Sequence, residues 1–88
     1  MKIVIYTKDG CPNCVTAKRL MDSNDLQYEE RDIEMSQHAF EFYATFPHVR
    51  QMPQILVDSI LIGGLAGLKT YLPVILRKMG KPTPEEKS

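Results

Sequence analysis

The sequence has neither an excess of charge nor a long hydrophobic run. Its 11 lysines and arginines balance 11 aspartates and glutamates, whereas a nucleic-acid-binding domain normally carries a basic excess. Apolar runs such as Phe42-Tyr43-Ala44 are far shorter than the ~20 residues of a membrane-spanning helix, and the N-terminus lacks the apolar stretch of a signal peptide. We therefore expect a cytoplasmic protein that binds no nucleic acid and enters no membrane.

Cysteine is also scarce, because the chain contains only Cys11 and Cys14. A disulfide scaffold in a small secreted protein would use four or more cysteines. A structural zinc site needs four ligands, and the only histidines, His38 and His48, are too far apart in the sequence to form the usual pair. We therefore expect no metal and place both histidines at the surface. Two cysteines separated by two residues fit a reversible dithiol in a reducing compartment better.

The length of 88 residues and the hydrophobic content of 43% fit one small globular domain. We expect this domain to span residues 1–80. Residues 81–88 contain prolines and glutamates but no large apolar side chain, which predicts a flexible C-terminal tail.

The first half of the sequence predicts a strand, a helix and a second strand. The β-branched and aromatic run at residues 3–6 favours a strand buried on both faces. Pro12 suits the first turn of a helix, and residues 12–23 carry an apolar stripe on one helical face, formed by Cys14, Ala17 and Met21. Residues 26–33 predict a charged edge strand. This β-α-β order requires parallel strands joined by a right-handed crossover.

The second half predicts a helix, a hairpin and a final helix. Residues 35–46 carry an apolar stripe at helical spacing that we expect to pack in the core, formed by Met35, Ala39, Phe42, Tyr43 and Phe46. The apolar runs at 55–57 and 60–62 are separated by two polar residues, which is typical of a hairpin. The last apolar stripe, over residues 65–79, predicts a helix that Pro73 either kinks or divides into two.

The complete order is therefore β-α-β-α-β-β-α, a parallel half followed by an antiparallel hairpin. A mixed four-stranded sheet flanked by helices is the natural arrangement of these elements. The Cys-x-x-Cys pair follows the first strand and opens a helix, which is where the motif of a thioredoxin-like α/β fold is expected.

The position of Cys11 before a helix favours its thiolate, which is the nucleophile in disulfide exchange. An ordinary cysteine, with a pKa of ~8.5, is only about 3% ionised at pH 7, whereas the free N–H groups and the dipole at a helix start favour negative charge. Lys8 lies close enough in the sequence to add a positive charge, and a hydrogen bond from the Cys14 thiol would stabilise the thiolate further. Cys14 lies inside the helix and suits the resolving role.

Pro53 directly precedes an expected strand, and proline is tolerated only at the first position of a strand. A cis Met52-Pro53 bond would turn the backbone N–H and C=O groups of Met52 outward, where they could pair with an extended peptide-like substrate.

Three stretches together resemble the glutaredoxin family. They are residues 5–14 (Ile-Tyr-Thr-Lys-Asp-Gly-Cys-Pro-Asn-Cys), residues 49–55 (Val-Arg-Gln-Met-Pro-Gln-Ile) and residues 62–64 (Ile-Gly-Gly). The resemblance covers nearly the whole chain and implies a thioredoxin fold with a cis Pro53. It also implies Cys11 as the nucleophile, Cys14 as the resolving thiol and glutathione as the reductant. The residues that it places around glutathione are Lys8, Arg50, Met52, Pro53, Gly64, Leu65 and Ala66.

The sequence departs from the family pattern at two places. Asn13 stands where the family usually has tyrosine, so an aromatic side chain over the sulfur is missing. Leu65, Ala66 and Gly67 stand where the family commonly has acidic residues that hold the γ-glutamyl ammonium. Backbone N–H groups at this helix start could still bind the carboxylate of the γ-glutamyl end, but its ammonium has lost a partner.

The resemblance implies an enzyme, a small dithiol glutaredoxin that reduces protein disulfides and glutathione mixed disulfides. Its expected partners are glutathione and disulfide-containing or glutathionylated proteins, with ribonucleotide reductase as a candidate, and we expect a monomer. One alternative is a redoxin reduced by thioredoxin reductase, which the missing acidic residues favour. Another is a non-catalytic carrier that bridges an iron–sulfur cluster through Cys11 and glutathione. Pro12 argues against the carrier, because related cluster-binding proteins usually have a smaller, more flexible residue there.

Overall fold

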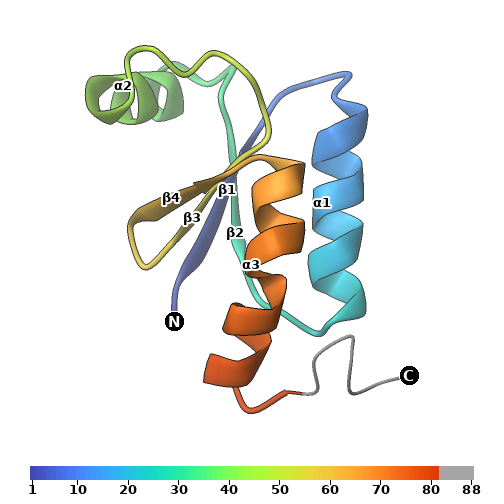
Figure 1. The fold of residues 1–88 in the computed structure, drawn as a ribbon. Helices are drawn as coiled ribbons and strands as arrows, with labels where there is room; N and C mark the ends of the chain where they lie inside the picture. The colour runs from blue at the N-terminus through green and yellow to red at the C-terminus, as the bar shows by residue number, and fades with distance from the viewer. Residues whose placement is uncertain (82–88) are drawn as a thin grey trace.

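A computed structural model describes residues 1–81 of the chain and contains seven helices and strands (Figure 1). Their order is the predicted one: β1 (Ile3–Thr7), α1 (Pro12–Ser23), β2 (Glu29–Asp32), α2 (Ser36–Thr45), β3 (Gln54–Val57), β4 (Ile60–Gly63) and α3 (Leu65–Lys78). The expected domain end at residue 80 stays a prediction, and the expected tail lies, apart from Lys81, outside the described residues. None of the helices within residues 1–81 is long and apolar enough to cross a membrane.

The strands form one mixed four-stranded sheet in the order β2-β1-β3-β4. β1 pairs in parallel with β2 and antiparallel with β3, and β3 pairs antiparallel with β4. Helices α1 and α3 lie side by side on one face of this sheet, and α2 lies on the other face (Figure 1). The predicted thioredoxin-like arrangement of a mixed sheet flanked by helices is therefore confirmed.

The central strand β1 is buried along its whole length, as its composition predicted. Its alternate side chains enter two separate clusters. Ile3 and Ile5 pack with the apolar faces of α1 and α3, whereas Val4 and Tyr6 pack with Phe42 of α2 and with both cysteines. One face of the strand therefore packs against α1 and α3, and the other face belongs to the cluster that contains the two cysteines.

Two predicted boundaries are wrong in detail. The second strand is shorter than the expected 26–33, because Asp25 takes a positive φ of 56° and Leu26 is buried before pairing with β1 begins at Glu29. Met35 was expected in the core stripe of the second helix but is 50% exposed. It is the N-cap of α2, so its backbone is extended and its side chain does not follow the helical spacing.

The structure shows how α3 accommodates Pro73 and which type of turn joins the two strands of the hairpin. α3 runs unbroken from Leu65 to Lys78 with Pro73 inside it, so the proline does not divide it into two helices. The hairpin turn is Asp58-Ser59, with φ values of 50° and 71°, which are the positive angles that a two-residue hairpin of type I′ requires. The backbone N–H of Lys2 donates to Asp58 Oδ1 at 2.8 Å, which fixes the turn to the start of β1.

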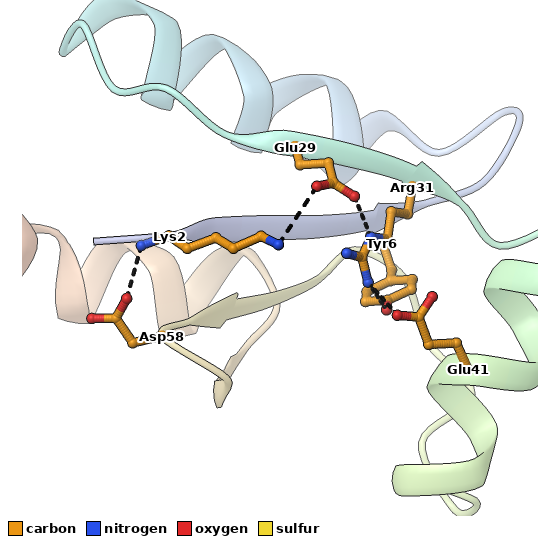
Figure 2. Close-up of polar contacts among 6 residues, drawn as sticks. All are labelled: Lys2, Tyr6, Glu29, Arg31, Glu41 and Asp58. Carbon is orange, nitrogen blue, oxygen red and sulfur yellow. Dashed lines mark hydrogen bonds and ion pairs between the residues drawn. The ribbon is translucent and has the colours of Figure 1, made fainter.

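Arg31 joins α2 to the sheet (Figure 2). Its Nη1 donates to the hydroxyl of Tyr6 at 2.9 Å and to Glu41 Oε1 at 2.6 Å. Its Nε donates to Glu29, and this hydrogen bond is the largest cause that raises the pKa of Arg31 above its ordinary value. The aromatic ring of Phe42 continues the contact, with its centroid 4.8 Å from that of Tyr6. One side chain of β2 therefore contacts both β1 and α2.

At Gly67 the backbone of α3 lies close to β4, and replacing this glycine tests the packing. A Cβ at residue 67 would lie 1.9 Å from the carbonyl oxygen of Ile62. A glycine-to-alanine change inside a helix normally stabilises by roughly 0.5–1 kcal/mol. Gly67→Ala should instead lower the free energy of unfolding by about 1–3 kcal/mol, the usual cost of overpacking, as measured by denaturant titration.

The matched control is Ala66→Gly at the neighbouring exposed position. It should cost only the helix propensity of roughly 1 kcal/mol. A Gly67→Ala protein as stable as the parent would show that α3 does not lie this close to β4.

Candidate active site

Cys11 is the N-cap residue of α1. Gly10, with a φ of 66°, turns the chain out of β1, and Pro12 occupies the first turn of the helix, where its missing N–H is not needed. The backbone N–H of Cys14 donates to Cys11 Sγ at 3.1 Å. The same N–H also donates to the carbonyl oxygen of Cys11 at 3.1 Å. The hydrogen bond that the sequence suggests from the Cys14 thiol belongs to the reduced form and stays a prediction.

Cys11 and Cys14 are joined by a disulfide, and their Cα atoms are 5.3 Å apart. Cys11 is 8% exposed and Cys14 is 2% exposed. Cys11 is therefore the more accessible of the two residues, and Cys14 is the more deeply buried. This is the arrangement expected of a nucleophile in front of a resolving thiol.

The Met52-Pro53 peptide bond is cis, as the resemblance implied. The carbonyl oxygen of Met52 lies 3.5 Å from Cys11 Sγ. The side-chain amide of Gln54 donates to the carbonyl of Gln51 at 2.9 Å, which connects the two ends of this loop. Met52 and Pro53 are therefore placed directly beside the disulfide.

The start of α3 adjoins the same loop. A Cβ at Gly64 would lie 3.1 Å from the carbonyl oxygen of Pro53, so this glycine allows the two segments to approach. Gly64 is the N-cap of α3, and the first turn after it, with Leu65 and Ala66, contains no acidic residue. Of the residues predicted around glutathione, the structure thus brings Pro53, Gly64 and the helix start together.

The two predicted cations take different positions. Lys8 is exposed and lines, together with both cysteines, a cavity of about 490 Å³. Arg50 is also exposed, and its guanidinium carbon lies 4.6 Å from the ring centroid of Tyr43. The contact with Tyr43 of α2 was not predicted, because the sequence does not show which face of that helix the following loop meets.

Other residues of the cavity were missed as site residues. Glu30 lies in its wall, where its Oε2 accepts hydrogen bonds from Thr7 Oγ1 at 2.9 Å and from Lys18 Nζ at 3.0 Å. Asp9 and Asp32 line the cavity as well. Strand alternation was the available signal, since it places Glu30 and Glu29 on opposite faces of β2.

Neither histidine takes part in this site. His48 is exposed, and His38 is half-buried with its Nδ1 3.1 Å from the carbonyl oxygen of Asp32. The carboxylates of Asp9, Asp32 and Glu34 lie within 4.8 Å of one another beside the cavity. Their negative charge opposes the effect of Lys8 on a thiolate at Cys11.

The arrangement can carry out thiol–disulfide exchange. A dithiol gives up two electrons and two protons when its disulfide forms, and a substrate disulfide that takes them up becomes two thiols. The more exposed sulfur at a helix start is suited to the first attack, because its thiolate is stabilised there.

Comparison with known proteins relates the chain to thiol–disulfide oxidoreductases, in agreement with the chemistry that the geometry allows. The Glutaredoxin family model matches residues 3–62. Glutaredoxin 1 of Escherichia coli is 38% identical over 80 residues, which cover 82% of this chain and 93% of that protein. Glutaredoxin 1 of Rickettsia bellii is 38% identical over 66 residues, which cover 70% of this chain and 67% of that protein.

Solved structures show the same relationship. The crystal structure of glutaredoxin 1 from Francisella tularensis superposes with a TM-score of 0.73 at 32% identity, and covers 86% of this chain and 96% of that one. Reduced Escherichia coli glutaredoxin gives a TM-score of 0.69 at 31% identity, with coverage of 88% and 99%. The family match, the shared fold and the Cys11–Cys14 pair agree, and the chain belongs to the glutaredoxin family, whose members are generally thiol–disulfide oxidoreductases.

Proposed function

We propose that this protein is a glutathione-dependent oxidoreductase that reduces protein disulfides and glutathione mixed disulfides through Cys11 and Cys14. One observation carries the proposal: Cys11 Sγ accepts a hydrogen bond at the start of α1 and lies beside the Met52 carbonyl, while Cys14 is buried behind it. The nucleophile, the resolving thiol and a backbone segment for the substrate thus occupy one site.

In the two-cysteine route, the Cys11 thiolate attacks a protein disulfide and one substrate thiolate leaves. The Cys14 sulfur then attacks Cys11 of the mixed disulfide, the second substrate thiolate leaves and the Cys11–Cys14 bond forms. Two glutathione molecules reduce this bond and become glutathione disulfide. In the one-cysteine route, Cys11 alone takes glutathione from a modified protein, and a second glutathione releases it.

Glutathione would lie across the cis-proline loop and the start of α3. The Met52 backbone pairs with its cysteinyl unit, and Lys8 and Arg50 lie near its carboxylates. The backbone N–H groups at Leu65 and Ala66 hold the γ-glutamyl carboxylate, since the start of a helix attracts anions. We further propose a monomer in the cytoplasm, where a reducing environment keeps the dithiol turning over, with ribonucleotide reductase as a candidate substrate.

A second candidate function is a redoxin reduced by thioredoxin reductase. It is favoured by the absence of acidic residues from the first turn of α3, which leaves the glutathione ammonium with one fewer partner. The iron–sulfur carrier is disfavoured by Pro12, which is fixed in the first turn of α1. An anaerobic preparation that is coloured would support the carrier, whereas a colourless one that reduces a glutathione mixed disulfide supports the enzyme.

The two cysteines should differ in what they are needed for. Cys11→Ser should abolish every thiol–disulfide activity, because the nucleophile is lost. Cys14→Ser should abolish reduction that requires the dithiol but keep appreciable removal of glutathione from a mixed disulfide, which needs Cys11 alone. The measurement is the glutathione-supported turnover of both variants on a protein disulfide and on a glutathione mixed disulfide. Equal losses in both assays would contradict this division of roles.

Lys8→Ala should raise the pKa of the Cys11 thiol, because a cation near the thiolate is removed. The effect should be modest, less than about a fivefold loss of the thiolate fraction, since exposed charges contribute only ~0.2–1 kcal/mol. Thiolate absorbance against pH in the Cys14→Ser background isolates Cys11. Lys78→Ala, in the last turn of α3, is the control and should leave the titration as it was. An unchanged titration in Lys8→Ala would make Lys8 only a solvated charge.

Ala66→Asp should strengthen glutathione binding. Ala66 is exposed in the first turn of α3, where an added carboxylate can reach the γ-glutamyl ammonium. An exposed ion pair contributes ~0.2–1 kcal/mol, which corresponds to a KM for glutathione lowered about 1.4- to 5-fold at low salt. Ala66→Asn, which has the same shape without the charge, should lack the gain. No change, or a weaker affinity, would show that residue 66 does not face glutathione or that electrons come from another donor.

A further inference from the structure

The cavity of about 490 Å³ beside the disulfide joins the buried Cys14 to a charged cluster on the sheet. Cys14 and Lys18 are four residues apart on α1, and both line this cavity. Thr7 at the end of β1 and Glu30 of β2 line it as well. A cavity of this size has room for several water molecules, each of which occupies ~30 Å³.

Glu30 lies at the open side of this cavity, where 42% of its side chain is exposed and two donors orient its carboxylate. The hydroxyl of Thr7, which is 4% exposed, and the ammonium of Lys18 both donate to its Oε2. Within residues 1–81 no hydrogen bond to Oε1 is formed, so this oxygen can accept a proton or a water hydrogen bond. Thr7 and Lys18 are therefore positioning residues for the carboxylate.

The resolving step requires such an acceptor. Cys14 must lose its thiol proton before its sulfur can attack, because the thiolate is the reactive form. With 2% of its surface exposed, Cys14 has little direct contact with bulk water. Cys14 shares the cavity with the carboxylates of Asp9, Glu30 and Asp32. Glu30 is the one oriented by Thr7 and by Lys18, which lies one turn after Cys14 on α1. General bases act through one water as well as directly.

We propose that Glu30 accepts the proton of Cys14 when Cys14 resolves the mixed disulfide. The proposal rests on the dithiol chemistry proposed above and adds a residue to it. The proton passes from Cys14 Sγ to the Glu30 carboxylate through cavity water. The Cys14 sulfur then bonds to Cys11, the bond between Cys11 and the substrate sulfur breaks, and the substrate leaves as a thiolate. That thiolate takes up the proton through solvent, which restores the carboxylate.

The groups around Glu30 keep its carboxylate ionised at neutral pH, which is the form that can accept a proton. The hydrogen bond from Lys18, and after it the one from Thr7, holds the pKa of Glu30 below its usual value. Partial burial of the carboxylate, and after it the negative charge of Asp32, opposes this lowering of the pKa. The charge of Glu30 in turn contributes to raising the pKa of Tyr28. Lys8 and Asp9 complete the charged lining of the cavity with opposite signs. The carboxylate is therefore ionised when Cys14 gives up its proton.

The test uses a symmetric aromatic disulfide whose thiolate is coloured, mixed with reduced protein in a stopped-flow instrument. Attack by Cys11 releases the first coloured thiolate, and attack by Cys14 releases the second, so no glutathione is needed. In Glu30→Gln the first phase should keep its rate and the second should slow at least ~10-fold at neutral pH. This loss lies below the ~10²–10⁴-fold typical of general acid–base catalysis, because a carboxylate with a lowered pKa is a weaker base.

The sign of the change separates proton transfer from a simple charge effect. Removing a negative charge beside Cys14 favours its thiolate, so a carboxylate that acted only as a charge would leave Glu30→Gln with a faster second phase. Glu29→Gln, on the opposite face of β2, is the matched control and should leave both phases unchanged. A second phase of Glu30→Gln that is unchanged or faster would overturn the inference. If the parent protein itself releases no first coloured thiolate, the proposed dithiol function is contradicted instead.

Discussion

The hydrogen bond from the Cys14 backbone N–H to Cys11 Sγ is the contact on which the function of this fold depends. It exists because α1 begins at Pro12, directly after the capping cysteine, so that the Cys14 N–H of the first turn is shared between the sulfur and the carbonyl oxygen of Cys11. The helix is held in this position by its buried face, where Ala17 and Met21 are fully covered by the core beside β1. A modest core of side chains thus fixes the Cys11 sulfur at the N-terminal end of a helix, and the partial positive charge of that helix end stabilises the thiolate.

The short edge strand β2 makes polar side-chain contacts on both faces of the sheet. Because alternate strand residues point to opposite faces, Arg31 contacts Tyr6 and Glu41 on the side of α2 (Figure 2). Glu30 contacts Thr7 and Lys18 on the side of α1. The first set joins α2, and with it the loop that carries Arg50, to the sheet. The second set places a carboxylate in the cavity behind the disulfide. Charges that serve only to protect an exposed edge in many sheets here also shape the surroundings of the site.

Most of the fold could be predicted from the sequence, because β1, α1 and the hairpin carry strong local signals: a β-branched run, Pro12 after a turn, and two apolar segments around Asp58-Ser59. The cis Met52-Pro53 bond came from the family resemblance, since few X-Pro bonds are cis. Met35 was misplaced because helical spacing continues through an extended N-cap residue. Alternation along β2 places Glu30 and Arg31 on opposite faces of the sheet, but the partners of these residues and of Arg50 depend on how distant segments pack, which sequence spacing does not show.

The reduction of the Cys11–Cys14 disulfide by glutathione tests the proposed function most directly. The oxidised protein is incubated with glutathione at the ratio of reduced to oxidised form found in a reducing compartment, and free thiols on Cys11 and Cys14 are counted over time. A parallel sample receives thioredoxin reductase and its nicotinamide reductant. We expect both thiols to be recovered with glutathione alone. A disulfide that persists in glutathione but is reduced by thioredoxin reductase would contradict a glutathione-dependent enzyme.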